Sequence, residues 1–344
     1  MNQSLIEKIL TARVYDVAKE TPLDFAKLLS KRTNNQIYLK REDLQAVFSF
    51  KLRGAFNRMF QLSDAAKARG VIAASAGNHA QGVAMSGMTM GVETRIVMPK
   101  ITPEIKVKGV ESWGGKAILQ GDNFDEAYAH ALALAEKHNL TFLHPFDDLD
   151  VIAGQGTIGM ELLRQHPDPI DFIFVAVGGG GLISGIATYI KYLSPTTKII
   201  GIEHEEAASM TESFKQNKRV ILDQIGFFAD GAAVKQVGKN TLRIAREVVD
   251  EMMTVSTDET CAAIKDVFED TRTLLEPAGA LATAGMKKYI QQNKVENQQI
   301  ISICSGANIS FDRLRHVAER AELGEKREAL LAVTIPEKPG SFQA

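Results

Sequence analysis

A single lysine stands inside the apolar run FSFKLRGA (48–55). Two readings of Lys51 fit this setting. A lysine on an amphipathic helix normally extends into solvent. A lysine held partly out of water instead has a lowered pKa, so its free amine is available for chemistry. The other motifs of the chain must decide between the two.

Four consecutive glycines follow an apolar run in AVGGGGLISG (176–185), and a helical pattern begins directly after them. Glycines let the backbone approach a ligand closely and present successive N–H groups, and a helix N-terminus adds partial positive charge. A tight strand–helix turn is the alternative, but one or two glycines would suffice for it. The motif therefore predicts an anion site, most simply for a phosphate.

The glycines do not match the common nucleotide motifs. In the dinucleotide pattern G-x-G-x-x-G, the last glycine would have to replace Ile183 or Ser184, although Glu203 lies at a suitable distance for a ribose contact. No Walker lysine follows the glycines either. A small phosphorylated cofactor fits better than a nucleotide.

Two further polar turns follow apolar runs. AASAGNHAQG (73–82) could bind a carboxylate through its N–H groups and the Ser75 hydroxyl, and Asn78 offers both an amide donor and an acceptor. Helix N-capping is an equally good reading of this segment, and His79 alone is more typical of a structural residue. SICSGAN (302–308) ends in Ser305 and Gly306, where a tight turn is again the alternative.

Short β-rich runs alternate with helical patterns along the chain, which predicts parallel sheets with helices on their faces. In such folds ligands bind at the carboxyl ends of the strands, where the motifs lie. The predicted helices include 123–139 and 260–275. The predicted strands are 36–40, 70–75, 94–99, 116–120, 141–145, 171–177, 198–203, 251–256 and 298–305.

Composition narrows the class of protein. The 344 residues are 45% hydrophobic and 24% charged, typical of a globular protein with two lobes or domains. The net charge of -2 does not favour nucleic acid as a partner, and no stretch approaches about 20 apolar residues, so no membrane is expected. The chain has two cysteines, Cys261 and Cys304, far apart and without nearby histidines at ligand spacing, so neither a disulfide framework nor a zinc site is expected. This cysteine usage favours the reducing cytoplasm as the compartment.

The motifs SFKLRGA, SAGNHAQG, VGGGGL, EPAGA and SGAN, in this order, resemble the pyridoxal-phosphate enzymes of fold type II. Among these the chain is most similar to the biosynthetic threonine dehydratases, over about residues 10–344. The resemblance implies an α/β fold with two lobes: a small lobe at about 46–144, inserted in a large lobe at about 1–45 and 145–320. It also implies a homo-oligomer, a dimer or a tetramer.

The resemblance assigns roles around the cofactor. Lys51 would hold pyridoxal phosphate as a Schiff base, with Asn78 beside its phenolic oxygen, Ser305 at its pyridine nitrogen and Phe50 packed on its ring. The phosphate would bind Gly178, Gly179, Gly180, Gly181 and Leu182. A serine at the pyridine nitrogen does not favour ring protonation, which suits expulsion of a β-substituent.

The implied reaction is β-elimination from L-threonine, and less well from L-serine, giving 2-oxobutanoate and ammonia from threonine in isoleucine biosynthesis. Lys51 would take the Cα proton. The substrate carboxylate would bind the turn Ser75, Ala76, Gly77, Asn78 and His79. Glu276 of EPAGA would lie in the second layer of residues near the cofactor ring; the alternative is an acidic residue that starts a helix before Pro277. The alternatives are a catabolic serine/threonine dehydratase, a serine racemase, or a cofactor-carrying protein without turnover.

Two departures refine this resemblance, and the first, at Ala76, favours deamination over racemisation. Similar racemases carry a second serine, as a base on the opposite face of Cα, where Ala76 stands here. They also bind a divalent metal through an acid after a strand and another six residues on. Here Glu203 is followed at that offset by Ser209, so no metal is predicted.

The end of the chain resembles the beginning of a regulatory domain. Residues 321–344 read as a linker and then a strand, LLAVTIPEKPGSF, with nothing after it to pair with. We expect these residues to be the start of a truncated amino-acid-binding domain, loosely placed beyond about Glu328, and turnover to be insensitive to isoleucine. A strand docked on the catalytic part is the alternative.

Overall fold

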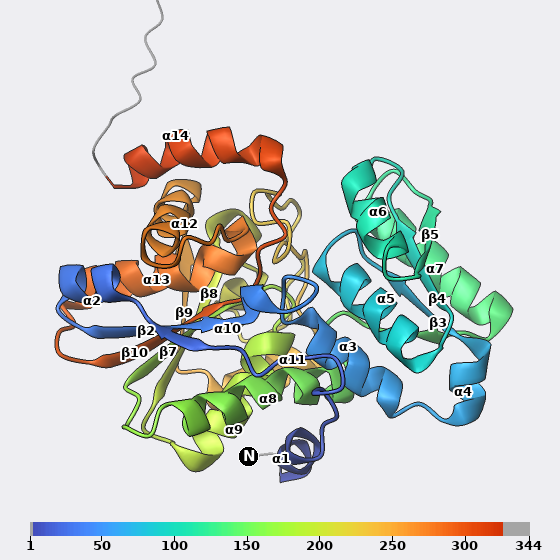
Figure 1. Cartoon of the computed structure of the whole chain (residues 1–344), viewed down its shortest axis with the longest axis horizontal. Helices are drawn as coiled ribbons and strands as arrows, with labels where there is room; N and C mark the ends of the chain where they lie inside the picture. The colour runs from blue at the N-terminus through green and yellow to red at the C-terminus, as the bar shows by residue number, and fades with distance from the viewer. Residues whose placement is uncertain (1–2, 326–344) are drawn as a thin grey trace, which may run out of the picture.

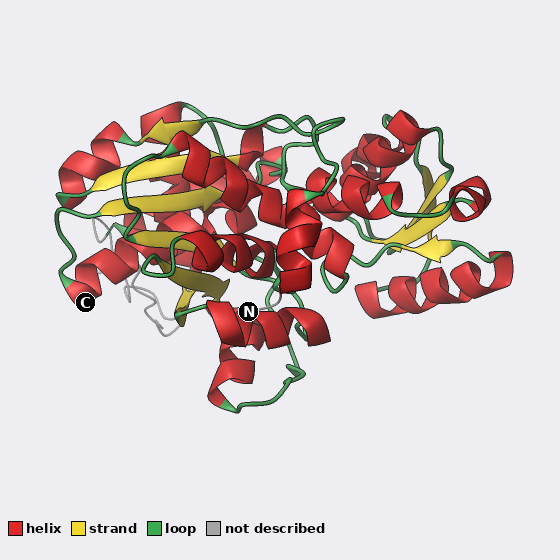
Figure 2. Ribbon diagram, turned by 90° about the horizontal axis from the view of Figure 1, so that it is seen from below, coloured by secondary structure: helices red, strands yellow, loops and turns green. Residues whose placement is uncertain are grey.

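The computed structural model describes residues 3–325. Their strands form two separate sheets, and helices cover both faces of each (Figures 1 and 2). The predicted α/β class with two groups of parallel strands is confirmed.

The larger sheet has six strands. In spatial order they are β1 (Leu23–Phe25), β2 (Gln36–Arg41), β10 (Gln299–Cys304), β7 (Phe172–Ala176), β8 (Lys198–His204) and β9 (Glu251–Val255). Only the edge strand β1 runs antiparallel, against β2. β7 is buried along its whole length, because Phe172 and Phe174 face one apolar core and Ile173 and Val175 face the other.

Helices supply the rest of both cores. On one side lie α2 (Lys27–Thr33), α12 (Thr257–Thr271), α13 (Pro277–Asn293) and α14 (Leu314–Gly324). On the other side lie α1 (Gln3–Leu10), α8 (Leu149–Gln165), α9 (Gly181–Leu193), α10 (Ser209–Lys215) and α11 (Lys239–Val248). Figure 1 shows α8 and α9 below the sheet and α12 to α14 above it. Three short 3₁₀ turns complete the described elements: η1 (Glu42–Leu44), η2 (Glu205–Ala207) and η3 (Phe311–Arg313).

The smaller sheet is entirely parallel, in the order β5 (Lys116–Leu119), β4 (Thr94–Met98), β3 (Val71–Ala74) and β6 (Thr141–Phe142). α7 (Phe124–His138) covers one face. α3 (Lys51–Phe60), α4 (Asp64–Arg69), α5 (Asn78–Met90) and α6 (Glu104–Glu111) cover the other. α3 also packs on α8 of the larger group, so it connects the two sheets.

Most predicted strands match the structure to within one residue at either end, but two expectations differ and one strand was not predicted. β6 stops at Phe142 instead of 145, because the His144 ring accepts the N–H groups of Phe146 and Asp147 and turns the chain. The helix predicted at 260–275 runs from Thr257 to Thr271, between a capping box at Ser256 and a left-handed residue at Arg272. No sequence pattern predicted the short edge strand β1.

The prediction for the end of the chain lies almost wholly outside the described residues. α14 ends at Gly324, and the expected strand falls within residues 326–344. In residues 3–325 no helix has the length and apolar character needed to cross a membrane.

Candidate active site

Four segments that follow the carboxyl ends of strands meet one another, and three of them were predicted as site segments. Ser75 follows β3, the glycines follow β7 and Ser305 follows β10. The fourth segment, Leu143–Asp147 after β6, carried no site prediction. It makes the contacts that join the others.

Lys51 is the first residue of α3, and its amine is held mostly out of water. Nζ donates to the backbone oxygen of Pro145 at 3.3 Å and lies 5.4 Å from the centre of the Phe50 ring. Burial lowers the pKa of Lys51 to about 8, although the negative charge of Glu276 opposes this shift. Of the two readings of Lys51, the structure favours the desolvated amine.

The glycine segment offers a row of unused donors. Gly181 begins α9 after Gly180, whose φ of 92° favours glycine. Within the described residues, none of the six backbone N–H groups from Gly178 to Ile183 donates to a protein acceptor, although Gly179 to Ile183 are buried. Buried N–H groups without partners carry a large penalty, so this helix N-terminus fits an anion such as a phosphate group.

The segment Leu143–Asp147 links the lysine to the glycines. Pro145 accepts from Lys51, and the ring of the next residue, Phe146, lies so close to Gly179 that a side chain there would collide with it. The Asp147 carboxylate accepts the first N–H groups of α11 and so fixes that helix beside the glycines. From α11, the Thr241 hydroxyl donates to the backbone oxygen of Gly179 at 2.6 Å. The sequence HPFDD (144–148) could have signalled this role only through its position after a strand.

The turn at 75–79 divides into an open part and a closed part. Ser75 Oγ accepts from the N–H of Gly77 at 3.2 Å, and a side chain at Gly77 would meet no atom within 4 Å, so there is space beside it. His79 is buried, and its Nε2 lies 3.0 Å from the oxygen of Leu143. Since a carbonyl only accepts, Nε2 carries the proton. Burial and the charge of Lys51 lower the pKa of His79 to about 3, so the ring is neutral.

Asn78, Glu276 and Ser305 converge from three elements. Asn78 begins α5 and donates through Nδ2 to Glu276 Oε1 at 2.5 Å. Glu276 precedes α13, and burial raises its pKa to about 7, with the Asn78 hydrogen bond opposing the shift. Ser305 is buried, with Oγ 3.4 Å from the oxygen of Ala278 and its own backbone oxygen accepting from Phe50 at 3.3 Å.

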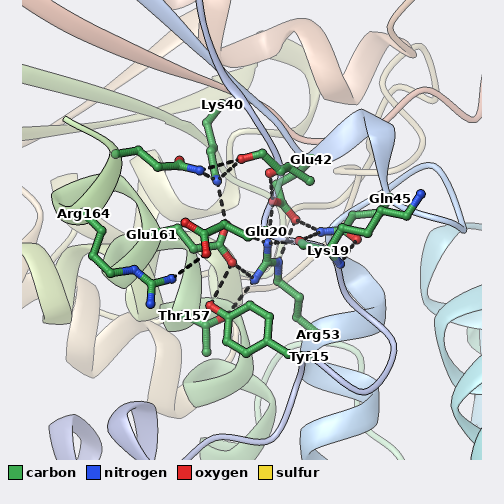
Figure 3. A network of polar contacts seen from close by, with 12 residues as sticks. Tyr15, Lys19, Glu20, Lys40, Glu42, Gln45, Arg53, Thr157, Glu161 and Arg164 are labelled. Atoms are coloured by element: carbon green, nitrogen blue, oxygen red, sulfur yellow. Dashed lines mark hydrogen bonds and ion pairs between the residues drawn. The ribbon is translucent and has the colours of Figure 1, made fainter.

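A buried ion cluster, which we define as Lys40, Glu42, Arg53 and Glu161, anchors the beginning of α3 (Figure 3). Arg53, two residues after Lys51, forms paired hydrogen bonds with both Glu42 and Glu161 and one with Thr157. Lys40 directs its three N–H groups at Glu161, Gln165 and the oxygen of Thr21. The cluster therefore ties α3 to β2 and α8.

Close backbone packing accompanies this cluster. A side chain at Gly154 of α8 would lie 2.6 Å from the oxygen of Arg53 and 2.8 Å from Cα of Gly54. Only glycine fits this helix crossing. α3, and Lys51 with it, is thus held by packing as well as by charge.

Glu203, considered above for a metal, has two backbone partners instead. Its carboxylate accepts from the N–H groups of Met210 and Thr211 at 2.8 and 2.7 Å, at the N-terminus of α10. Burial raises its pKa to about 7. Among residues 3–325 no group of three His, Cys, Asp or Glu side chains is arranged to hold a metal ion.

Comparison with known proteins gives one consistent family. The family described as pyridoxal-phosphate dependent enzyme matches residues 14–306. The biosynthetic L-threonine dehydratase of Burkholderia multivorans is 57% identical over 98% of this chain and 67% of its own length. The biosynthetic, chloroplastic threonine dehydratase of Arabidopsis thaliana is 54% identical over 98% of this chain but 57% of its own. The chain thus spans two thirds or less of the length of such relatives.

A solved structure agrees over nearly the whole described fold. The processed form of threonine deaminase isoform 2 from Solanum lycopersicum superposes with a TM-score of 0.91 at 50% identity. The match covers 92% of each chain.

Proposed function

Because this chain belongs to the pyridoxal-phosphate-dependent enzyme family, and within it to the threonine dehydratases, we propose that it deaminates L-threonine to 2-oxobutanoate and ammonia. L-Serine is the poorer substrate, and the reaction serves isoleucine biosynthesis. The observation that carries the proposal is the desolvated amine of Lys51, joined through Pro145 and Phe146 to a row of unused N–H groups.

The residues present fit pyridoxal phosphate. The N–H groups of Gly178, Gly179, Gly180, Gly181 and Leu182 would hold its phosphate, and Lys51 would bind it covalently. Asn78, Ser305 and Phe50 would surround its ring. When bound, the cofactor withdraws electrons from the Cα of the amino acid joined to it and so acidifies the Cα proton.

The chain's own residues account for positioning and proton transfer. The Lys51 amine would accept the Cα proton of the substrate, and its pKa of about 8 keeps a useful fraction of the amine neutral near pH 7. The open side of the Ser75–Gly77 turn receives the substrate carboxylate, while Asn78 and His79 close its other side. Glu276 stays behind Asn78 and holds that amide in place.

Turnover of L-threonine by the purified chain with added pyridoxal phosphate tests the proposal. We expect 2-oxobutanoate and ammonia in equal amounts, and pyruvate at a lower rate from L-serine. The absorption spectrum shows whether the cofactor is bound. If it is bound but no 2-oxo acid is released from either amino acid, the protein is a cofactor carrier and the proposal is wrong.

The pKa of Lys51 predicts how cofactor attachment depends on pH. The neutral amine attacks the aldehyde, so the attachment rate to cofactor-free protein should rise with pH, reach half its maximum near pH 8 and level off above it. Rapid-mixing absorbance measurements between pH 6 and 10 give this profile. A rate that keeps rising tenfold per unit up to pH 10 would mean that Lys51 titrates like an exposed lysine.

Substitution of Ser305 by aspartate tests its assignment to the pyridine nitrogen. A carboxylate there favours ring protonation and changes how the Cα carbanion partitions, so we expect the cofactor to be retained and kcat for threonine to fall about tenfold or more. Steady-state kinetics and the cofactor spectrum are the measurements. Unchanged kcat in a variant that retains the cofactor would remove Ser305 from this position.

Ala76 predicts little racemisation, because alanine offers no proton donor to the face of Cα opposite Lys51. After incubation with L-serine, we expect pyruvate and only traces of D-serine by chiral chromatography. In Ala76→Ser, which introduces the hydroxyl, D-serine should increase. D-serine formed by the unmodified chain as fast as pyruvate would favour a racemase instead.

We propose the following organisation. The small lobe comprises about 46–144 and the large lobe about 1–45 and 145–320, which the separate apolar cores of the two sheets support. We infer that the protein is cytoplasmic. We also infer that it is a dimer or a tetramer, and sedimentation analysis would determine which.

A further inference from the structure

Asn308, the last residue of SGAN, contacts two site segments with one nitrogen. Its Nδ2 donates to the backbone oxygen of Val47 at 2.9 Å and to Asn78 Oδ1 at 2.6 Å. Asn78 in turn donates to Glu276. The three side chains therefore form one chain of hydrogen bonds, Asn308 to Asn78 to Glu276.

The oxygen of Val47 fixes the direction of this chain. A backbone oxygen only accepts, so the atom of Asn308 facing it must be nitrogen. The same nitrogen faces Asn78, so Asn78 must turn its oxygen toward Asn308 and its nitrogen toward Glu276. Glu276 Oε1 is then an acceptor, and any proton on Glu276 is on its other oxygen.

The backbone holds Asn308 in place for this role. Residues 305–308 run antiparallel to residues 47–50, just before Lys51: Ser49 pairs with Gly306, the N–H of Ala307 donates to Phe48 at 2.9 Å, and Phe50 donates to Ser305. The space around the Asn78–Glu276 contact is equally restricted, because a side chain at Gly306 would collide with Glu276 Oε1.

We propose that Asn308 is a positioning residue that orients the Asn78 amide so that only an N–H of Asn78 faces the cofactor. Asn308 occupies the Asn78 oxygen, and Glu276 takes one of the two N–H groups. The remaining N–H points to an acceptor on the ligand, which suits an ionised phenolic oxygen. This inference rests on cofactor binding by the site and not on which amino acid is the substrate.

Asn308→Ala tests this role through cofactor affinity. Without Asn308, the Asn78 amide can turn over and present its oxygen, so we expect the dissociation constant for pyridoxal phosphate to rise about tenfold. In the Asn78→Ala background, the same substitution should change the constant less than twofold, since Asn308 acts through Asn78. Equilibrium titration of cofactor-free protein, followed by absorbance, measures both values without any turnover.

Asn35→Ala is the matched control. Asn35, which is buried where Asn308 is half-buried, likewise donates with one nitrogen to two oxygens, those of Thr33 and Val295. It lies at the amino ends of β2 and β10, opposite Ser305. We expect its cofactor affinity to be unchanged. An Asn35→Ala protein as weakened as Asn308→Ala would show a general folding effect and overturn the proposal.

Two other results would also overturn it: a folded Asn308→Ala protein with cofactor affinity within twofold of the unmodified chain, or effects of Asn308→Ala and Asn78→Ala that simply multiply. Should Asn308→Ala fail to fold, Asn308→Ser gives the same comparison, because its short hydroxyl cannot reach both Val47 and Asn78. A chain that binds the cofactor but does not deaminate threonine would refute the proposed function and leave this test intact.

Discussion

Replacement of Lys51 by alanine will lower kcat for threonine deamination by about three orders of magnitude or more. The change removes both the amine that binds the cofactor and the base that takes the Cα proton, and loss of a general base alone typically lowers rates 10²- to 10⁴-fold. The fold should survive, because within residues 3–325 the side chain makes a single hydrogen bond, to Pro145. Steady-state kinetics and thermal unfolding of the cofactor-free protein together measure both effects.

Borohydride reduction of the unmodified protein, followed by peptide mass mapping, locates the attachment directly. We expect the pyridoxyl group on the Lys51 peptide and not on that of Lys40 or Lys106. Lys106→Ala is the activity control, since Lys106 pairs with Asp230 and carries no proposed role in the chemistry. Retained turnover in Lys51→Ala, or a label on either other lysine, would end the assignment of Lys51.

The sequence predicted the positions of the strands and of the site loops well, because both depend on local patterns. Buried parallel strands are continuous apolar runs, and glycines or small polar residues mark where they end. The glycine segment and Ser305 were singled out in this way, and Lys51 as a lysine inside an apolar run. Resemblance to the family added the roles that local pattern leaves open, such as the pyridine nitrogen for Ser305.

What the sequence did not predict depends on contacts between distant residues. The strand expected at 141–145 is shortened by the His144 ring, whose bonds to the following N–H groups have no simple pattern. The role of Asn308 depends on Val47, which lies 261 positions away in the chain. Similarly, Arg53 reads as an ordinary charged helix residue until Glu161, 108 positions on, is seen beside it.

Arg53→Ala should be the most destabilising of the substitutions considered. Arg53 and both of its carboxylate partners are fully buried. Burial alone would lower the pKa of Arg53, but Glu42 and Glu161 more than offset this and raise it, so the guanidinium stays charged. Removing one partner of a buried ion pair typically lowers the free energy of unfolding by about 3–5 kcal/mol. Urea unfolding measures the loss. Arg315→Ala, which removes an exposed pair with Glu319, should leave the midpoint unchanged.

The pH dependence of the loss in free energy of unfolding distinguishes two causes, the unbalanced charges and the cavity left by the removed side chain. In Arg53→Ala, Lys40 faces two carboxylates, so the cluster carries one net negative charge. One carboxyl of the folded variant therefore binds a proton more readily than it does in the unfolded chain. The loss should therefore shrink as pH falls from 8 toward 5.5. Glu161→Gln leaves Lys40 and Arg53 facing Glu42 alone, with one net positive charge. Burial already lowers the pKa of Lys40, so in this variant the folded state releases the Lys40 proton at a lower pH than the unfolded chain does. The loss in free energy of unfolding should therefore shrink as pH rises from 7 toward 9. If the loss came from a cavity alone, it would be independent of pH in Arg53→Ala and small in Glu161→Gln, which keeps the shape of the side chain. Those two results would contradict the view that α3 is held beside Lys51 by a balanced set of charges.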